Sequence, residues 1–391
     1  MINFDFVSPT KIYFGKDREK EIGLILKSAG INKVLFHYGK NSIKKTGLYD
    51  MIISSFNKHN IEYYELGGVE PNPKISLVRQ GVEIVKSNKI PFILAVGGGS
   101  VIDSAKGIAV SAFSGIDIWD YSTQKETVKG ALPLGVILTI SAAGSELSNS
   151  CVLSNHELNL KRGFNSDLIR PKFAVMNPEL TYSVGKFQTG CGIVDIMMHT
   201  MERYLTDTTG IALPQNLGAG LIKSVMQKAK IAVDEPNNYD ARATLMLASS
   251  FSHNGLTGLG AKMYFTVHKL EHELSGMYDN VAHGAGLSVL FPAWAKYVYQ
   301  DFPELFAKFA VEVLEVEKNK KTTLEVAFEG ITKLQSFFKE IGMPTTLAEL
   351  MIESDNFEAM ANNATCNNTK KVLGIKDLDV NDIINIFNLA R

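Results

Sequence analysis

The segment FILAVGGGSVIDSAK, residues 92–106, decides the fold of this chain. An apolar run over 92–96 leads directly into the turn Gly97–Ser100, and a helical pattern follows over 101–113. This order predicts a buried strand, a glycine turn and a helix whose first N–H groups can approach a pyrophosphate. The spacing is neither GxGxxG nor a Walker loop, so the turn alone is as consistent with a tight connection as with phosphate binding.

Strands and helices are expected to alternate on both sides of this segment. Such alternation predicts right-handed crossovers and a parallel sheet. The expected strands cover 33–38, 61–66, 92–96, 135–140 and 173–177, and the expected helices cover 43–58, 77–88 and 101–113. A second turn, TISAAGSE at 139–146, carries small hydroxyl residues that could line a nucleotide or simply cap a helix.

Helical periodicity replaces this alternation after about residue 184. A chain of 391 residues, 45% of them hydrophobic, exceeds what one core usually holds. We therefore expect an α/β domain over 1–184 and an all-helical domain over 185–391, with the cleft between them as the natural site. The expected helices cover 191–206, 214–230, 238–250, 262–275, 284–299, 303–315 and 322–340.

Composition excludes several classes of protein. The net charge of −1 provides no long-range field for nucleic acid or an anionic membrane. Three distant cysteines make no CxxC pair, so neither a disulfide framework nor a thiolate metal site is expected. The first residues resemble no signal peptide, and no apolar run reaches the roughly 20 residues of a spanning helix. We expect a cytoplasmic protein without nucleic-acid or membrane partners.

Candidate metal ligands form two clusters in the second half. Asp195 and His199 are spaced i,i+4 on one predicted helix, as are His268 and His272, and His283 follows just before a glycine. The first pair alone is better explained by a hydrogen bond between its two side chains. Taken together, one carboxylate and several imidazoles favour a divalent transition metal, Fe²⁺ or Zn²⁺, over Mg²⁺ or Ca²⁺.

Some of these residues allow other interpretations. His268, Glu271 and His272 form HxxEH, the inverted zinc-peptidase motif, in which both histidines bind zinc. That interpretation leaves the glycine turn and the Asp195 helix without a role, so it is disfavoured. Asp103 and Lys106 are expected to form an ordinary i,i+3 surface pair unless the cofactor uses them. The aromatic residues Phe251 and Phe265 are expected in the core.

Seven segments in this order resemble the iron-containing (group III) alcohol dehydrogenase family. The resemblance covers nearly the whole chain and is nearest to the butanol dehydrogenase and NADPH-dependent aldehyde reductase branch. Each segment is unspecific alone, whereas the set is highly specific. The segments are PTKIYFG (9–15), VEPNP (69–73), GGGSVIDSAK (97–106), AAGSE (142–146), DIMMHTMERYL (195–205), HKLEHELS (268–275) and HG (283–284).

The resemblance implies a fold and a metal site. It implies a Rossmann-like N-terminal domain with a parallel sheet, followed by an all-α C-terminal domain, the architecture also seen in dehydroquinate synthase. The family's ligands for one divalent metal fall on Asp195, His199, His268 and His283. His272 would lie near the metal and the nicotinamide, as a candidate for proton relay or substrate contact.

The resemblance also implies cofactor contacts. Asp103 and Lys161 would lie near the nicotinamide ribose, and Thr139 and Ser141 would belong to a second cofactor loop. The pyrophosphate would be cradled by Gly97, Gly98, Gly99 and Ser100.

The corner after the first long strand bears on the choice of cofactor. An acidic residue there binds a ribose 2′-OH and disfavours a 2′-phosphate. Here the corner reads Tyr-Gly-Lys-Asn-Ser over 38–42, which is neutral to basic. We therefore expect contacts from Gly39, Asn41 and Ser42 and a preference for NADP(H), with NAD(H) possible.

The activity that the resemblance implies is hydride transfer between NAD(P)(H) and a primary alcohol or aldehyde. The same architecture also serves enzymes resembling glycerol dehydrogenase and dehydroquinate synthase, which remain alternatives. A non-catalytic metal-binding or nucleotide-binding protein is a third possibility. The resemblance further implies a homodimer.

Overall fold

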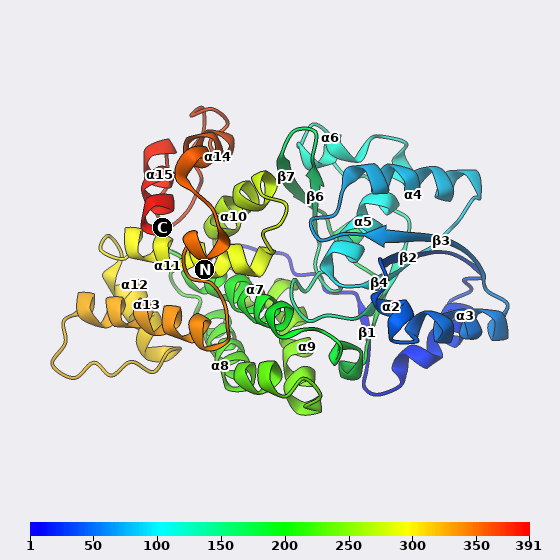
Figure 1. Cartoon of the computed structure of the whole chain (residues 1–391), viewed down its shortest axis with the longest axis horizontal. Coiled ribbons are helices and arrows are strands. Elements are labelled where there is room, and N and C mark those ends of the chain that lie inside the picture. The colour runs from blue at the N-terminus through cyan, green and yellow to red at the C-terminus, as the bar shows by residue number, and fades with distance from the viewer. The chain divides into compact units, whose positions relative to one another are not determined.

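The computed structural model describes residues 1–391 and divides the chain into two compact units (Figure 1). We call them the sheet unit and the helical unit. The sheet unit comprises Val7–Val184 and Pro236–Ser250, and the helical unit comprises Met1–Phe6, Gly185–Glu235 and Phe251–Arg391. Each unit is therefore built from segments that are not continuous in sequence.

A six-stranded parallel sheet, in the order β1-β8-β5-β4-β2-β3, forms the centre of the sheet unit. All residues of β4 and β5 are buried, as expected for parallel strands covered on both faces. The predicted Rossmann-like α/β fold is confirmed. The strands are β1 (Lys11–Phe14), β2 (Lys33–Gly39), β3 (Glu62–Val69), β4 (Ile93–Gly97), β5 (Leu134–Leu138) and β8 (Phe173–Met176).

Helices cover both faces of this sheet. Side chains alternate along each strand, so that Ile93 packs into the core under α4 and α5 while Leu94 packs into the core under α1 and α3. The helices that begin in the first half of the chain are α1 (Ile22–Ser28), α2 (Ser42–Lys45), α3 (Leu48–His59), α4 (Ile75–Ser87), α5 (Gly99–Ser114) and α6 (Ile118–Ser122).

Two features of the sheet unit differ from the sequence expectation. The helix expected over 43–58 is divided into α2 and α3, because Gly47 has a positive φ of 76° that a continuing helix does not allow. An antiparallel hairpin of β6 (Ser150–Asn155) and β7 (Leu160–Asn165) was not anticipated. Short 3-10 turns complete the chain at 18–21, 167–169, 178–181, 256–258, 348–350 and 354–356.

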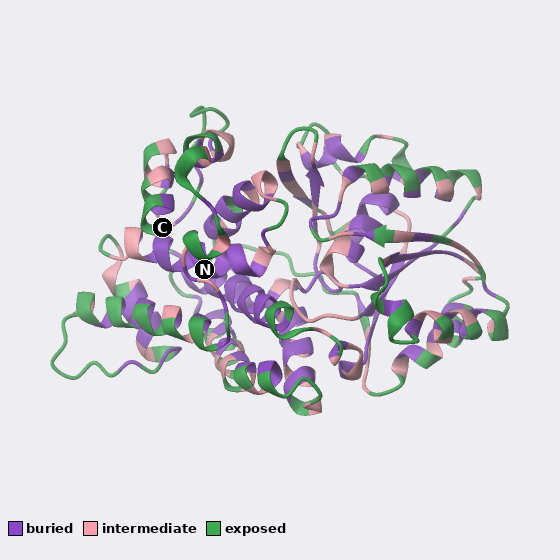
Figure 2. Ribbon diagram, in the orientation of Figure 1, coloured by how far each residue is buried: buried purple, intermediate pink, exposed green.

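The helical unit is organised around α7 (Lys186–Tyr204). Every residue of this helix from Thr189 to Tyr204 is buried, which Figure 2 shows as a continuous purple ribbon. It packs against α8 and α11, and α10 packs against α11 and α14. The further helices of this unit are α8 (Ala212–Asp234), α10 (Thr266–Met277), α11 (His283–Val298), α12 (Pro303–Glu312), α13 (Thr323–Glu340), α14 (Phe357–Ala364) and α15 (Val380–Leu389). Helix α9 (Tyr239–His253) belongs to the sheet unit up to Ser250 and to the helical unit from Phe251. None of the helices has the length and apolarity that crossing a membrane requires.

Candidate metal and cofactor sites

Four side chains from three helices converge within the helical unit. Asp195 and His199 project from one face of α7, His268 lies in the first turn of α10, and His283 is the first residue of α11. The Oδ1 atom of Asp195 lies 3.4 Å from Nδ1 of His199, 3.6 Å from Nε2 of His268 and 3.7 Å from Nε2 of His283. Residues up to 88 positions apart in sequence thus place three imidazole nitrogens within 3.7 Å of one carboxylate oxygen.

These distances fit a single small cation. Ligand atoms at about 2.0–2.2 Å from a tetrahedral metal lie roughly 3.3–3.6 Å from one another. Asp195 Oδ1, His199 Nδ1 and His268 Nε2 are also buried without a hydrogen-bond partner. A buried polar atom left unpaired costs about 1–3 kcal/mol. The expected hydrogen bond between Asp195 and His199 is therefore not formed, and the donor set suits a divalent transition metal.

Two buried carboxylates accept hydrogen bonds from the Nδ1 atoms of His268 and His283, on the side of each ring opposite Nε2. The Nδ1–H of His268 donates to Oε2 of Glu202, whose Oε1 accepts from the backbone N–H of Val267 at 2.6 Å. The Nδ1–H of His283 donates to Oε2 of Glu271. A hydrogen bond at Nδ1 fixes the tautomer in which Nε2 carries a lone pair for a metal. Both imidazole rings are thus held with Nε2 facing Asp195.

Sequence reasoning did not identify these two roles. Glu202 follows His199 by three residues and Asp195 by seven, so the helical spacing was an available signal. In the peptidase interpretation Glu271 would be a general base and His272 a zinc ligand. Here the carboxylate of Glu271 contacts His283, and His268 groups with Asp195 and His199 rather than with His272. The geometry therefore disfavours the HxxEH peptidase.

Charge distribution within the site differs between two of the histidines. Burial by itself lowers the pKa of His268, but the carboxylates of Glu202 and Asp195 outweigh it and raise this pKa to about 9. Burial, together with the neighbouring rings of His253 and His268, lowers the pKa of His199 well below its usual range. His199 is consequently neutral at every physiological pH, whereas His268 would have to lose a proton to bind a metal.

His199 is also contacted by an aromatic ring, that of His253, and by a cationic side chain, that of Arg203. The ring of His253 lies 3.9 Å from that of His199, centroid to centroid, and its Nδ1 lies 3.0 Å from Nη2 of Arg203. Buried Arg203 also donates to the carbonyl oxygen of His199 at 2.6 Å. Phe265, which was expected in the core, is only half-buried and places its ring 5.4 Å from that of His268. Neither His253 nor Arg203 was anticipated.

His272 lies one turn after His268 on α10. Its ring centroid is 5.7 Å from that of His283, and its side chain is half-buried. It groups with Glu271 and His283, and not with Asp195, His199 and His268. Its role in proton relay stays a prediction.

The glycine turn of the sheet unit has the form of an anion cradle. Gly97 ends β4, Gly98 precedes the helix, and α5 begins at Gly99 and continues through Ser100. A Cβ on Gly98 would lie 2.2 Å from Cγ2 of Ile140, so only glycine fits there without a shift. No side chain caps α5, and its first turn contains no acidic residue. Its first N–H groups and the helix dipole therefore suit a pyrophosphate.

A second loop adjoins this turn. The backbone N–H of Thr139 donates to the carbonyl oxygen of Gly97 at 3.1 Å. The hydroxyl oxygen of Ser141 is buried without a hydrogen-bond partner. Ser249, from the segment of α9 that belongs to the sheet unit, pairs with the backbone N–H and carbonyl of Ala142, both at 3.1 Å. The loop is thus held rigidly beside the glycine turn with an unused hydroxyl.

Asp103 and Lys106 do not form the expected surface pair. Lys106 is fully buried, and its Nζ donates to the carbonyl oxygens of Ser145 at 2.8 Å and Ser150 at 2.7 Å. Asp103 accepts from the hydroxyl of Ser145 at 2.6 Å and from the backbone N–H of Val152 at 2.9 Å. The exposed-pair expectation was wrong because residues distant in sequence supply the polar partners. Both side chains hold the second loop and the hairpin on α5.

The remaining cofactor candidates are Lys161 on the β6–β7 hairpin and the corner after β2, which comprises Gly39, Asn41 and Ser42. The Nζ of buried Lys161, on β7, donates to Oδ1 of Asn72 at 3.0 Å. Gly39 ends β2, and Asn41 and Ser42 begin α2. A Cβ on Gly39 would lie 4.0 Å from Cγ2 of Val101, so this corner directly adjoins the first turn of α5.

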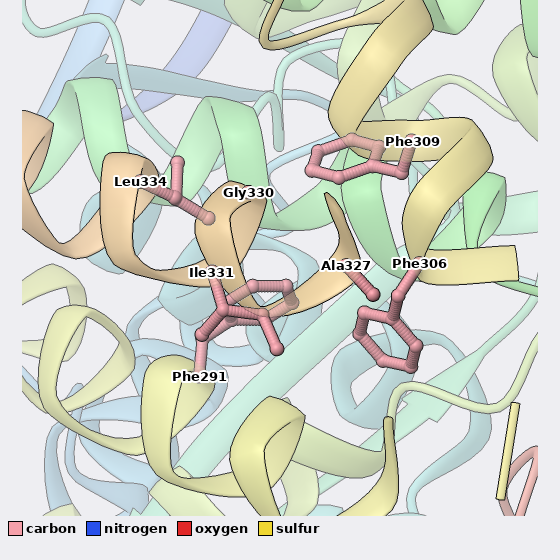
Figure 3. Close-up of a pocket in the computed structure, with 7 residues that line it drawn as sticks. All are labelled: Phe291, Phe306, Phe309, Ala327, Gly330, Ile331 and Leu334. Carbon is pink, nitrogen blue, oxygen red and sulfur yellow. The ribbon is translucent and has the colours of Figure 1, made fainter. Parts of the chain in front are cut away.

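A small apolar cavity of about 10 Å³ lies elsewhere in the helical unit, among α11, α12 and α13 (Figure 3). No titratable or hydrogen-bonding side chain lines it, so it can supply no acid–base or metal chemistry. Its lining residues are Phe291, Phe306, Phe309, Ala327, Gly330, Ile331 and Leu334.

Comparisons with known proteins identify the family. Residues 9–178 match the family described as iron-containing alcohol dehydrogenase, and residues 189–390 match the C-terminal domain of the Fe-containing alcohol dehydrogenase family. NADH-dependent butanol dehydrogenase A of Clostridium acetobutylicum is 39% identical over 99% of both chains. NADPH-dependent aldehyde reductase YqhD of Escherichia coli is 32% identical over 92% of both. The crystal structure of NADH-dependent butanol dehydrogenase A from Thermotoga maritima superposes with a TM-score of 0.95 at 36% identity, covering 100% of this chain and 99% of that one. The chain belongs to the iron-containing alcohol dehydrogenase family.

Proposed function

We propose that this protein is a metal-dependent oxidoreductase that transfers a hydride between NAD(P)(H) and a primary alcohol or aldehyde. The observation that carries the proposal is the convergence of Asp195 Oδ1 with three imidazole nitrogens at 3.4 to 3.7 Å. Three of these four atoms are buried without a hydrogen-bond partner, and a bound cation would satisfy all three. Butanol and butanal are the substrates that the named relatives suggest.

Asp195, His199, His268 and His283 would hold one divalent cation, Fe²⁺ or Zn²⁺. Bound there, the cation supplies Lewis acidity toward a substrate oxygen. Glu202 and Glu271 keep His268 and His283 in the ligating tautomer throughout.

The sheet unit would bind the dinucleotide. The N–H groups of Gly99 and Ser100 would face the pyrophosphate, and the hydroxyl of Ser141 would donate to the cofactor. The half-buried imidazole of His272 would take up the proton that the alcohol releases.

We further propose that NADP(H) is preferred and NAD(H) accepted. In support, the corner at the end of β2 offers the cation of Lys40 and the polar side chains of Asn41 and Ser42, with no acidic residue of its own. The relatives include both NADH-dependent and NADPH-dependent enzymes.

Anaerobically purified protein, analysed for metal content and assayed with butanal, tests this function. We expect about one Fe²⁺ or Zn²⁺ per chain and loss of reduced-nicotinamide absorbance with both cofactors. His268→Ala should lose metal and activity together, whereas His59→Gln, at the far end of α3, should change neither. Full activity of His268→Ala with its metal retained would contradict the ligand assignment.

A further inference from the structure

Three charged side chains form a cluster at the carboxyl ends of β2 and β3. Lys40 follows Gly39 at the end of β2, Glu70 follows Val69 at the end of β3, and Lys74 directly precedes α4. Lys40 Nζ forms an ion pair with Oε1 of Glu70, and Lys74 Nζ lies 2.7 Å from Oε2 of the same carboxylate. Each carboxylate oxygen therefore has its own ammonium partner.

The cluster adjoins the glycine turn. β2 lies between β4 and β3, with Tyr38 opposite Val96 and Gly39 opposite Val69. Gly39 is consequently level with Gly97, the first glycine of the turn. In parallel sheets of this kind the pyrophosphate lies at the helix N-terminus, and the adenosine ribose lies at the end of the neighbouring strand. The neighbours of β4 are β5 and β2, and the loop after β5 is the second loop beside the glycine turn. The ribose is therefore assigned to the end of β2, where a 2′ substituent would approach the cluster.

The charges in the cluster oppose one another. Hydrogen bonds from Lys40 and then Lys74 lower the pKa of Glu70 to about 2, so its carboxylate is ionised at physiological pH. Two ammonium groups and one carboxylate leave a net charge of +1. The side chain of Lys40 is 61% exposed and can turn toward a ligand, whereas those of Glu70 and Lys74 are 34% exposed. A 2′-phosphate would be attracted by the lysines and repelled by Glu70. A 2′-OH carries no charge, so the lysines would not favour it in the same way.

We propose that the Lys40–Glu70–Lys74 cluster sets the choice between NADPH and NADH. Lys40 and Lys74 receive the 2′-phosphate, and Glu70 competes for them and so limits the preference for NADPH. This proposal rests on the proposed function for its catalytic consequence, but the binding step stands apart from hydride transfer. Glu70 is therefore a specificity-determining residue at the end of β3, whereas such residues usually lie at the end of the strand that corresponds to β2.

The experiment measures binding and catalysis separately. Calorimetry with adenosine 2′,5′-bisphosphate and with AMP gives the affinity ratio that the 2′-phosphate confers. Steady-state assays with butanal give the kcat/KM ratio for NADPH over NADH. The variants are Lys40→Met, Glu70→Gln and the double variant Lys40→Met/Lys74→Met. Lys58→Met, which removes the same charge from the exposed end of α3, is the matched control.

Lys40→Met should lower both ratios about tenfold, because one charge-assisted phosphate contact is lost, and the double variant should lower them further. Glu70→Gln should raise both ratios about three- to tenfold, and Lys58→Met should leave them within twofold. Lys58→Met should also keep the wild-type kcat with NADH.

Affinity ratios within twofold of wild type in Lys40→Met and the double variant would overturn the proposal. A lower ratio in Glu70→Gln would do the same. If the wild-type protein reduces no aldehyde with either cofactor while the affinity ratios change as stated, the proposed function fails and the cluster assignment stands.

Discussion

The carboxylates of Glu202 and Glu271 are not proposed metal ligands, but they orient two of the imidazoles that are. Glu202 and Glu271 each accept the Nδ1–H of one imidazole, and both are buried in the helical unit. An imidazole without this support rotates more freely and is a weaker base. Residue type and spacing indicate the proposed ligands, whereas these supporting contacts determine how their imidazole rings are oriented.

Replacement of Glu202 by Gln should weaken metal binding by about 10- to 100-fold. The amide keeps the shape of the side chain but removes the negative charge beside His268. Competition with a fluorescent chelator measures the loss. Glu304→Gln, an exposed change on α12, is the control and should leave the affinity unchanged. Equal metal affinities for Glu202→Gln and the control would refute the supporting role.

Metal affinity should also rise with pH. Because the pKa of His268 is raised to about 9, a metal must displace a proton from this residue at any lower pH. The apparent affinity should increase roughly tenfold per pH unit below about 9 and level off above it. The raised pKa also means that His268 stabilises the metal-free protein below pH 6.5, and this contribution disappears as the pH rises through about 9. Chelator competition from about pH 6 to 10 gives the profile, and a flat one would contradict the assignment.

At the scale of elements, the β4–α5 connection leaves no space for a side chain at Gly98. An alanine at Gly98 would place its Cβ 2.2 Å from Cγ2 of Ile140. Gly98→Ala should therefore destabilise the protein by about 1–3 kcal/mol and raise the KM for the cofactor. Urea unfolding and initial rates measure the two effects.

A second substitution and a control separate crowding from other causes. Ile140→Ala removes the atom that the new Cβ would meet, so the double variant should recover cofactor affinity. Gly220→Ala, in the interior of α8 where a Cβ meets no atom within 4 Å, should instead stabilise the protein by about 0.5–1 kcal/mol. A Gly98→Ala protein with wild-type stability and KM would show that the turn has room to spare.

The elements themselves were largely predictable from periodicity. Apolar runs located the central strands, and helical spacing located every helix from α7 to α13. The hairpin β6–β7 was missed because its position depends on Asp103 and Lys106, whose partners lie about 40 residues away. The four proposed ligands could be chosen by residue type and spacing. Glu202, His253 and Arg203 could not, because only the packing of α7, α9 and α10 shows what they contact.

At the scale of the whole molecule, the two proposed binding sites belong to different compact units. The proposed metal ligands all lie in the helical unit, and the glycine turn lies in the sheet unit. A ligand at 100 times its Kd stabilises the structure that binds it by about 2.7 kcal/mol. Each ligand should therefore protect its own unit most directly.

Hydrogen exchange with and without each ligand tests this expectation. Addition of Zn²⁺ to chelator-treated protein should slow exchange in α7, α10 and α11, and AMP should slow it in β4 and the first turns of α5. The His268→Ala variant should lose the first effect and retain the second. Zinc-dependent protection confined to β4 and α5 would contradict the assignment of the metal site.

The path of the chain between the units has a practical consequence for protein engineers. Residues Met1–Phe6 belong to the helical unit, and Pro236–Ser250 belong to the sheet unit, where Ser249 and Ser250 bond to Ala142 and Glu146. A chimaera could join residues 1–184 of this chain to the C-terminal half of a relative. Its sheet unit would then contain the relative's counterpart of Pro236–Ser250, the segment that contacts the second loop. Recombination therefore needs coordinated crossovers near residues 6, 184, 235 and 250, so that each compact unit is inherited intact.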